Sequence, residues 1–371
     1  MKFKNIGWTL GNDCPCKCKH CYSMQVRNKG KDLSKEIIDI VIKQIMKLGC
    51  ETVNFGGNEP IYTNGLDVKK SLLPYIINEL VDKGVDVGLT TSGLSAIYLE
   101  KYYKEEFLKL NDIDVSIDSP IESEHDENRG KNVFKIAIKA LELCEKYKKD
   151  STIVMCAMKW NFTKDRIKEL VELSKKYGTN IRINILKPTD EKHLDMMPSI
   201  SQIKEGFNYL VEICDTLDMS EPSLAGAFEN KNVSGCSCGV KSLRINSITS
   251  DGKIAVSPCV YMHHFKVGNL LEDDILDIIK SPQFKEFENR KNNYKNILEC
   301  KDCASIDICR GGCAASAYWY NYNKNKTKDM FCKDPYCIKE IGNDLNVVKY
   351  KKVKRLVHQD YLCTWIGKVK E

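Results

Sequence analysis

The sequence predicts an α/β protein in two parts: a partial (β/α)6 barrel of the TIM type over residues 1–215, then a small, irregular cysteine-rich domain over residues 232–345. The first observation behind this prediction is a repeated alternation of β-branched runs with helical patterns. The second is that thirteen of the 18 cysteines fall into two zones, residues 14–21 and 236–337. Residues 346–371 are predicted to be a basic C-terminal tail with a solvated helix.

Six short β-branched runs predict the strands of the barrel, and five segments between them have the apolar spacing of helices. The strands are expected at IGWTL (6–10), ETVNF (51–55), VDVGLT (85–90), IDVSID (113–118), STIVMCA (151–157) and NIRINIL (180–186). The helices are expected over residues 33–49, 72–84, 95–110, 132–149 and 163–178. Alternation repeated this often predicts parallel strands joined by crossover helices.

Polar or glycine-rich residues follow every predicted strand, at the end where a barrel of this type places its site. In chain order they are the cysteine loop 14–21, GGNEP (56–60), TTSG (90–93), Ser116 and Asp118 with HDENRG (125–130), Asn161, and KPTD (187–190). Each signal alone is weak, because a glycine pair usually marks only a turn. Six signals in the same register predict one functional site.

Composition and charge exclude several classes of protein. The formal charge of +6 is mild and spread along the chain, so nucleic acid is not expected as a partner. The first residues have no apolar core long enough for a signal peptide, and no later run is long enough to span a bilayer. We therefore expect a cytoplasmic protein, whose cysteines are metal ligands, catalytic groups or core residues rather than disulfides.

Five isolated cysteines are predicted to be structural, because each stands among apolar or helical residues. They are Cys50, Cys144, Cys156, Cys214 and Cys363. The N-terminal loop is different: Cys14, Cys18 and Cys21 have C-x3-C-x2-C spacing, which lets three thiolates meet one [4Fe–4S] cluster. Three ligands leave one iron open to a substrate or cofactor, and Cys16 is then a bystander. A four-cysteine zinc site is the competing interpretation.

This loop resembles the signature of the radical S-adenosylmethionine (radical SAM) superfamily, with His20 before the last cysteine. The sequences GGNEP and VSID resemble two further motifs of that superfamily. The resemblance implies that the open iron binds the amino and carboxylate groups of SAM, and that Gly56, Gly57 and Glu59 meet its ammonium. It also implies that Ser92, Ser116 and Asp118 lie near the ribose or amino-acid portion, and His20 near the adenine. Asn58 is an extra residue in GGNEP, so either Asn58 or Glu59 takes the acidic position.

The second cysteine zone resembles the SPASM extension of radical SAM enzymes that mature peptides and proteins. Its cysteines flank a predicted β-hairpin with the turn SDGK (250–253) and continue downstream: Cys236, Cys238, Cys259, Cys300, Cys303, Cys309, Cys313, Cys332 and Cys337. The resemblance implies two auxiliary [4Fe–4S] clusters. Cys300, Cys303, Cys309 and a last cysteine hold the distal one; DPYC (334–337) favours Cys337 over Cys332.

Cys313 is implied to join the hairpin cysteines on the nearer cluster, where Cys236, Cys238 or both bind. Zinc ribbons are the competing interpretation for this zone. His263 and His264 are expected to be a surface pair, and AYWYNY (317–322) to pack the small domain.

The predicted activity is reductive cleavage of SAM to a 5′-deoxyadenosyl radical that takes hydrogen from a substrate. The expected substrate is a ribosomally synthesised peptide that gains a crosslink or a related modification. A sulfatase-maturating enzyme is disfavoured because Val260, not aspartate, follows Cys259. The sequence is also compatible with a tetrapyrrole or quinone-cofactor enzyme, or with a non-catalytic metal-binding scaffold. No residue is predicted as the catalytic acid or base.

Partners are expected for electrons and for the substrate. The electron donor would be a protein such as flavodoxin or ferredoxin. The chain begins almost at its first strand, so we expect a peptide leader to be gripped by the barrel, by the tail or by a separate peptide-recognition protein.

Overall fold

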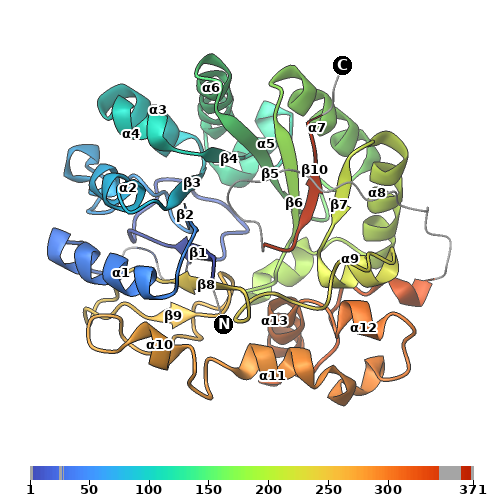
Figure 1. Ribbon diagram of the computed structural model, residues 1–371. Helices are drawn as coiled ribbons and strands as arrows, with labels where there is room; N and C mark the ends of the chain where they lie inside the picture. The colour runs from blue at the N-terminus through green and yellow to red at the C-terminus, as the bar shows by residue number, and fades with distance from the viewer. Residues whose placement is uncertain (1–2, 25–26, 28, 342–360, 369–371) are drawn as a thin grey trace.

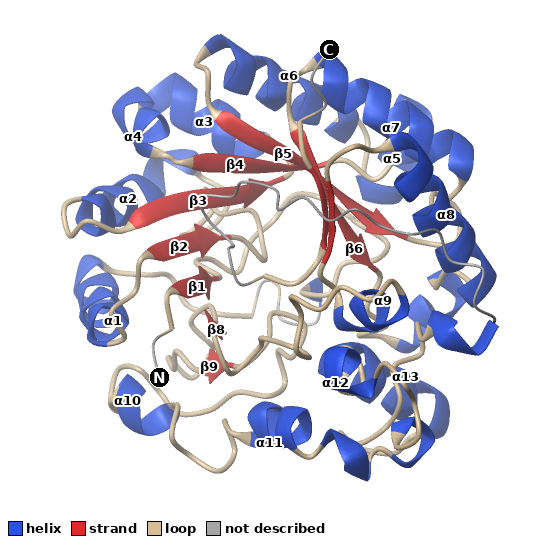
Figure 2. Cartoon of the chain, turned by 45° about the vertical axis from the view of Figure 1, so that its right-hand side comes forward, coloured by secondary structure: helices blue, strands red, loops and turns tan. Residues whose placement is uncertain are grey.

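The computed structural model describes residues 3–24, 27, 29–341 and 361–368. Parallel strands form the inner layer of a barrel, and helices surround it (Figures 1 and 2). A smaller part with short helices lies below the barrel in the view of Figure 1. The predicted basic helix at residues 349–358 lies outside the described residues.

The six predicted barrel strands are confirmed, with bounds that differ from the predicted ones by a few residues. They pair in parallel in chain order: β1 Asn5–Trp8, β2 Thr52–Phe55, β3 Asp86–Thr91, β4 Asp112–Ser116, β5 Asp150–Ala157 and β6 Asn180–Ile185. Parallel strands joined by right-handed crossovers bring their carboxyl ends to one edge of the sheet. The fold class predicted from the sequence is therefore correct.

The five predicted helices are present, and one of them is divided in two. Two further barrel helices were not predicted: one contains most of HDENRG, which was expected in a loop, and the other follows β6. The barrel helices are α1 Lys35–Lys47, α2 Leu73–Val81, α3 Leu94–Tyr102, α4 Lys104–Lys109, α5 Glu122–Arg129, α6 Val133–Lys146, α7 Lys164–Lys176 and α8 Ile200–Ile213. The single helix expected over residues 95–110 is two helices, because Tyr103 leaves the helical conformation with φ −143°. Ser34, Thr163 and Ser199 cap helices by accepting hydrogen bonds at their side chains.

Four further strands extend the sheet beyond the six predicted in the barrel. They are β7 Leu217–Met219, β8 Ser242–Ile245, β9 Val256–Ser257 and β10 Thr364–Ile366, and the full order is β7-β10-β6-β5-β4-β3-β2-β1-β8-β9. β8 pairs in parallel with β1 and antiparallel with β9, so the predicted hairpin is joined to the barrel edge. β10 lies antiparallel between β6 and β7, where the sequence had predicted only a tail.

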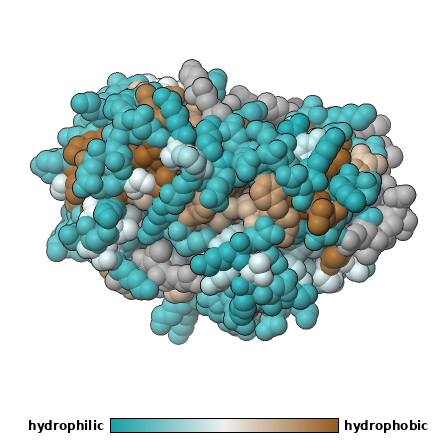
Figure 3. All heavy atoms as spheres, turned by 90° about the horizontal axis from the view of Figure 1, so that it is seen from below, coloured by the Kyte–Doolittle hydropathy of each residue, from teal (hydrophilic) through white to brown (hydrophobic). Residues whose placement is uncertain are grey.

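The cysteine-rich part contains short helices packed around loops. Its helices are α10 Ile275–Ile278, α11 Glu286–Asn292, α12 Ile306–Cys309 and α13 Ala314–Asn325, and α9 Pro222–Ala227 connects it to the barrel. Tyr318 and Trp319 of α13 are buried with Cys259, Met262 and Phe287, so AYWYNY does pack this domain. Figure 3 shows that hydrophilic residues cover most of the lower face, with apolar residues in a few separate areas.

One apolar core fills the space between the barrel strands and the surrounding helices. Trp8, Phe55, Ile113, Ile153 and Ile183 are among its buried members. Continuous burial on both faces is typical of parallel sheets, and it fixes the strand ends on which the polar residues lie. No helix among the described residues is long and apolar enough to cross a membrane.

Candidate active site

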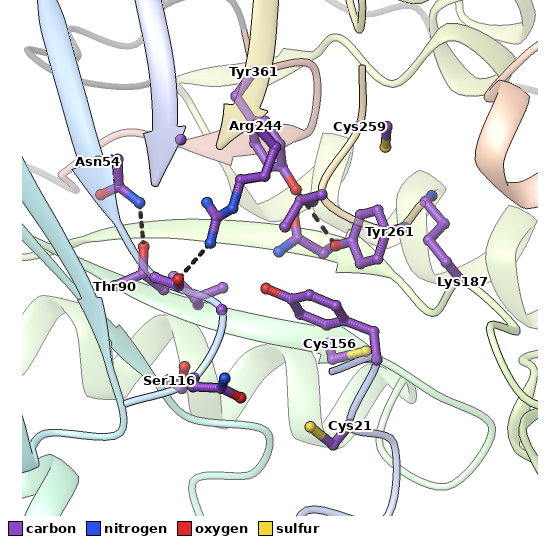
Figure 4. Close-up of a pocket in the computed structure, with 18 of the residues that line it drawn as sticks. Cys21, Asn54, Thr90, Ser116, Cys156, Lys187, Arg244, Cys259, Tyr261 and Tyr361 are labelled. Atoms are coloured by element: carbon purple, nitrogen blue, oxygen red, sulfur yellow. Dashed lines mark hydrogen bonds between the residues drawn. The ribbon is translucent and has the colours of Figure 1, made fainter. Parts of the chain in front are cut away.

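A cavity of about 210 Å³ lies at the carboxyl ends of the strands. Its wall includes the N-terminal cysteines Cys14, Cys18 and Cys21 and, from the second zone, Cys238 and Cys259. Figure 4 shows Cys21 and Cys259 on different sides of the same space. The two zones are more than 200 residues apart in sequence, and the joining of β8 to β1 brings them to one cavity.

The N-terminal cysteine loop is held by helix α5. The backbone N–H groups of Lys17 and Lys19 donate to the carbonyls of Arg129 and Asn128, at 2.9 Å each. Burial raises the pKa of Cys18 to about 12, and the nearby Arg129 opposes that shift. The Nη2 of Arg27 lies 3.1 Å from the Sγ of Cys21. Cationic neighbours favour thiolates, the form in which cysteine binds iron. The loop therefore suits a [4Fe–4S] cluster.

Cys16 also lines the cavity, although the spacing predicts a bystander. Cys16 shares a side-chain hydrogen bond with Cys14. This bond raises the pKa of Cys14 and lowers the pKa of Cys16. The four thiols of the loop pack together around Val133. No three Cys, His, Asp or Glu side chains of the described residues are arranged to hold a single metal ion.

Glu59 is buried in the cavity wall and is surrounded by hydrogen-bond donors. It accepts from the backbone N–H groups of Ser92 (2.9 Å) and Ser95 (3.0 Å) and from the hydroxyls of Thr91, Ser92 and Ser95. These donors lie where β3 ends and α3 begins. Glu59 therefore fastens the GGNEP loop to the end of β3. Asn58 accepts from the hydroxyl of Ser23 at 2.9 Å and donates to the carbonyl of Gly11.

Asp118 is fully buried and lies behind the cavity wall. Its carboxylate accepts from Arg129 Nε at 2.6 Å, from Asn128 Nδ2 at 2.8 Å and from the backbone N–H of Cys156 at 3.0 Å. Burial opposes ionisation, but Arg129 and His20 outweigh it and lower the pKa of Asp118. Burial lowers the pKa of His20 to about 4, so its ring is neutral at pH 7.

The structure thus brings most of the predicted SAM-contact residues to one wall. Six of the seven line the cavity: His20, Gly56, Gly57, Glu59, Ser92 and Ser116. Asp118 is absent from this wall and instead orients Arg129, which does line it. The sequence reasoning noted the segment HDENRG but assigned no role to its arginine. Asn54, Arg182 and Arg244 were also missed, because strand interiors gave no separate signal for them; Thr90 was noted only as part of TTSG.

A second, smaller cavity of about 40 Å³ adjoins the hairpin. Five cysteines line it: Cys236, Cys238, Cys259 and Cys313 of the second zone, and the isolated Cys363. Hydrogen bonds with Cys236 and Cys259, together with burial, raise the pKa of Cys238. The same contact with Cys238 lowers the pKa of Cys236 to about 6. Burial raises the pKa of Cys313 to about 12, with a further contribution from Cys236. Both Cys236 and Cys238 thus lie in one group with Cys259 and Cys313.

The downstream cysteines form another group, in which Cys337 rather than Cys332 lies near the others. Burial raises the pKa of Cys300 to about 11, and the neighbouring Cys337 and Cys303 raise it further. Cys337 and Cys300 also raise the pKa of Cys309, after burial and Asp334. Cys332 instead donates from its thiol to the carbonyl of Asp329 at 3.2 Å.

Several side chains that were predicted to have no functional role line the cavities or contact aromatic residues. Cys156 lines the larger cavity and Cys363 the smaller one, although both were predicted to be plain core. Cys363 is buried, and its Sγ lies 2.8 Å from Asn184 Oδ1. His264 is exposed as expected, but the ring of His263 stacks on Tyr22 with centroids 5.2 Å apart.

Family models match both parts of the chain. The radical SAM superfamily model matches residues 8–173, and that of the SPASM iron–sulfur cluster-binding domain matches residues 236–304. The chain therefore belongs to the radical SAM superfamily and carries a SPASM domain. It is an enzyme whose cofactors are S-adenosylmethionine, one [4Fe–4S] cluster in the radical SAM domain and auxiliary [4Fe–4S] clusters in the SPASM domain.

Similar proteins include several peptide-modifying enzymes. The mycofactocin maturase MftC of Mycolicibacterium smegmatis is 25% identical over 325 residues, which cover 85% of this chain and 79% of the relative. The solved structure of anSMEcpe with bound AdoMet and the Cp18Cys peptide has a TM-score of 0.65 at 18% identity, covering 92% of this chain and 95% of that one. Streptococcus suis SuiB bound to its precursor peptide SuiA has a TM-score of 0.63 at 14% identity, covering 90% and 75%.

Proposed function

We propose that this enzyme modifies a ribosomally synthesised peptide, bound in the larger cavity between the N-terminal cysteine loop and the hairpin cysteines. The observation that carries the proposal is that Cys14, Cys18 and Cys21 share one cavity with Cys238 and Cys259. A substrate in that space meets the SAM site and the auxiliary site at once. The relative named as a mycofactocin maturase, which aligns across both domains, supports a peptide substrate.

The ligand sets we propose follow the three groups of thiols. Cys14, Cys18 and Cys21 hold the cluster that binds SAM. The nearer auxiliary cluster is held by Cys236, Cys238, Cys259 and Cys313, and the distal one by Cys300, Cys303, Cys309 and Cys337. The proximity of Cys337 to Cys300 supports the last assignment. Four cysteines are the usual complement of such a cluster.

S-adenosylmethionine, when bound, would supply hydrogen-abstraction chemistry, since one electron from the N-terminal cluster would break it into methionine and a 5′-deoxyadenosyl radical. The residues of this chain bind and orient it. We propose that the backbone of Gly56 and Gly57 lies against the ammonium, with Glu59 holding their loop against β3. Ser92, Ser116 and His20 contact the rest of the molecule, and Asp118 acts through Arg129 and His20 rather than by direct contact. The buried cavity wall excludes water from the reaction.

Partner proteins complete the proposal. Reduction of the N-terminal cluster requires an electron donor such as a flavodoxin or a ferredoxin. A separate peptide-recognition protein would present the substrate. We also propose that the enzyme works in the cytoplasm, where thiols are kept reduced and available as cluster ligands.

The test combines two readouts on anaerobically reconstituted protein. With SAM and dithionite we expect 5′-deoxyadenosine, and with a short peptide encoded beside the gene we expect a change in the peptide's mass. Iron should approach about twelve per chain, since each of three clusters holds four. Iron near four with zinc in the remaining sites would overturn the auxiliary-cluster assignment. 5′-Deoxyadenosine without modification of any such peptide would overturn the substrate class.

A further inference from the structure

Four buried cations line the larger cavity, and three of them have carboxylate partners. Arg129 pairs with Asp118 at 2.6 Å, Arg182 pairs with Asp114 at 2.9 Å, and Lys187 pairs with Glu221. The fourth cation is Arg244 on β8, which is only 6% exposed. Within the described part of the chain, Arg244 takes part in no ion pair with a carboxylate.

The two hydrogen bonds of Arg244 go to uncharged groups. Its Nε donates to Thr9 Oγ1 at 2.8 Å, and its Nη2 donates to the carbonyl oxygen of Gly56. A guanidinium has five N–H donors, so these bonds use two of them. Burial lowers the pKa of Arg244, whereas acidic partners raise that of Arg129, Arg182 and Lys187 against the effect of burial. The contrast has a simple cause: among these four described cations, Arg244 is the one without a counter-charge.

The chain makes room for this guanidinium. Gly7 lies directly beside Arg244 in the β1–β8 register, and a Cβ at residue 7 would stand 2.5 Å from Nη1. Figure 4 shows the side chain of Arg244 reaching toward Asn54 and Thr90, with Cys259 and Lys187 on the opposite side of the cavity. Asn54 Oδ1 in that wall is a buried acceptor without a hydrogen-bond partner among the described residues. A cation and an acceptor in one wall suit a ligand that carries both an anion and an N–H group.

An unpaired buried charge carries a large free-energy penalty, which an anionic ligand removes. A carboxylate is the anion that a guanidinium binds through two parallel hydrogen bonds. The carboxylate of SAM has a nearer candidate, because Arg129 Nη1 lies 3.9 Å from Cys18 Sγ in the N-terminal loop. Arg244 instead stands on β8, the strand of the SPASM hairpin, and lines the cavity in which we propose that the peptide binds.

We propose that Arg244 binds a carboxylate group of the peptide substrate, an inference that rests on the proposed function. The carboxylate is either an acidic side chain or the free C-terminus of the peptide. Both present the same group to the guanidinium, and the test separates them.

The experiment measures binding of three short peptides to the reconstituted enzyme by ligand-detected NMR, with and without SAM. The probes are acetyl-Gly-Gly with a free carboxylate, acetyl-Gly-Gly amide, and acetyl-Asp-Gly amide. We expect the charged peptides to bind and the uncharged amide to bind at least tenfold more weakly. Arg244→Gln should reduce the affinity for the charged peptides about tenfold, while Arg244→Lys should keep part of it.

Two further variants control for folding and for position. Gly7→Ala keeps the charge but displaces the guanidinium, so it should weaken carboxylate binding in a folded protein. Arg166→Gln removes an arginine that pairs with Glu124 away from the cavity, and it should leave all three affinities unchanged. Preference for acetyl-Gly-Gly would identify the C-terminus, and preference for acetyl-Asp-Gly amide an acidic side chain.

The proposal is overturned if Arg244→Gln binds the charged peptides as the unmodified enzyme does, or if neither charged peptide binds that enzyme. It is also overturned if Arg244→Gln weakens SAM binding alone, because the carboxylate would then be that of SAM. Failure of the proposed function looks different: the unmodified enzyme would form 5′-deoxyadenosine but modify no peptide encoded beside the gene, whatever its affinity for carboxylates.

Discussion

At the scale of single residues, Asp118 is a buried carboxylate that orients residues of the cavity wall without lining the cavity itself. It receives hydrogen bonds from Arg129, Asn128 and the backbone of Cys156, and these partners come from α5 and β5. Removing one member of a buried ion pair leaves the other charge unpaired. Asp118 therefore contributes to stability as well as to the orientation of Arg129.

Asp118→Asn is expected to reduce the free energy of unfolding by about 3–5 kcal/mol, because Arg129 stays buried without its counter-charge. Denaturant unfolding of the reconstituted protein measures the change. The matched control is Glu124→Gln, which breaks the partly exposed pair with Arg166 and should cost no more than about 1 kcal/mol. Equal losses of unfolding free energy in the two variants would show that the buried Asp118–Arg129 pair contributes no more to stability than the Glu124–Arg166 pair.

Cys337 and Cys332 give a second test at this scale. Cys337→Ala should lose about four irons per chain, because it removes a thiolate of the distal cluster. Cys332→Ala should keep its full iron content, since its thiol contacts the carbonyl of Asp329 instead of the other cysteines. Iron analysis of both proteins after identical reconstitution decides the matter, and the reverse pattern would transfer the ligand role to Cys332.

At the scale of elements, strand β10 extends the barrel sheet with residues distant in sequence from the strands that it pairs with. It pairs with both β6 and β7, and the ring of Trp365 lies 5.3 Å from the guanidinium carbon of Arg182. Tyr361 precedes the strand and lines both cavities. Figure 4 shows Tyr361 beside Tyr261, with their hydroxyls 3.5 Å apart. The end of the chain is therefore part of the site.

Trp365→Ala is expected to reduce the free energy of unfolding by about 3–5 kcal/mol, as truncation of a buried tryptophan does. Trp160 is 36% exposed, so Trp160→Ala should change the free energy of unfolding by about 1 kcal/mol or less. Denaturant titrations of both proteins provide the comparison. A Trp365→Ala protein as stable as the Trp160→Ala protein would mean that β10 contributes nothing to the barrel.

The elements that the sequence analysis predicted are those with strong local periodicity. The strands β1–β6 and the helices between them repeat an apolar pattern long enough to recognise. β10 has three residues, and its burial depends on pairing with β6, more than 170 residues away. Arg244 was missed for a similar reason, because its position depends on the pairing of β8 with β1. The cysteines were found because their spacing is itself the signal.

At the scale of the whole molecule, buried neutral histidines link stability to pH. His125 is fully buried, and its Nδ1 accepts a hydrogen bond from the backbone N–H of Asp118 at 3.2 Å. Burial lowers the pKa of His125 to about 4, below the value of about 6.5 expected when the chain is unfolded. The unfolded chain therefore binds a proton more readily, and stability is lost as the pH falls below about 6.5.

Between pH 7.5 and 5 this histidine should remove about 2 kcal/mol from the free energy of unfolding. His125→Gln cannot take up that proton, so its stability should fall less over the same interval. Urea titrations at the two pH values, on both reconstituted proteins, give the difference. Parallel pH dependences in the two proteins would rule out His125 as a source of the acid sensitivity.

The central claim is a division of labour across one cavity, in which the N-terminal thiols serve the SAM reaction and the SPASM thiols serve the substrate. The most direct measurement assays 5′-deoxyadenosine, modified peptide and iron on the same preparations. The combined Cys14→Ala, Cys18→Ala and Cys21→Ala protein should form no 5′-deoxyadenosine and lose about four irons. Cys313→Ala should still form some 5′-deoxyadenosine but no modified peptide. Continued formation of 5′-deoxyadenosine by the triple variant, or full peptide modification by a Cys313→Ala protein that lacks its auxiliary iron, would contradict the account.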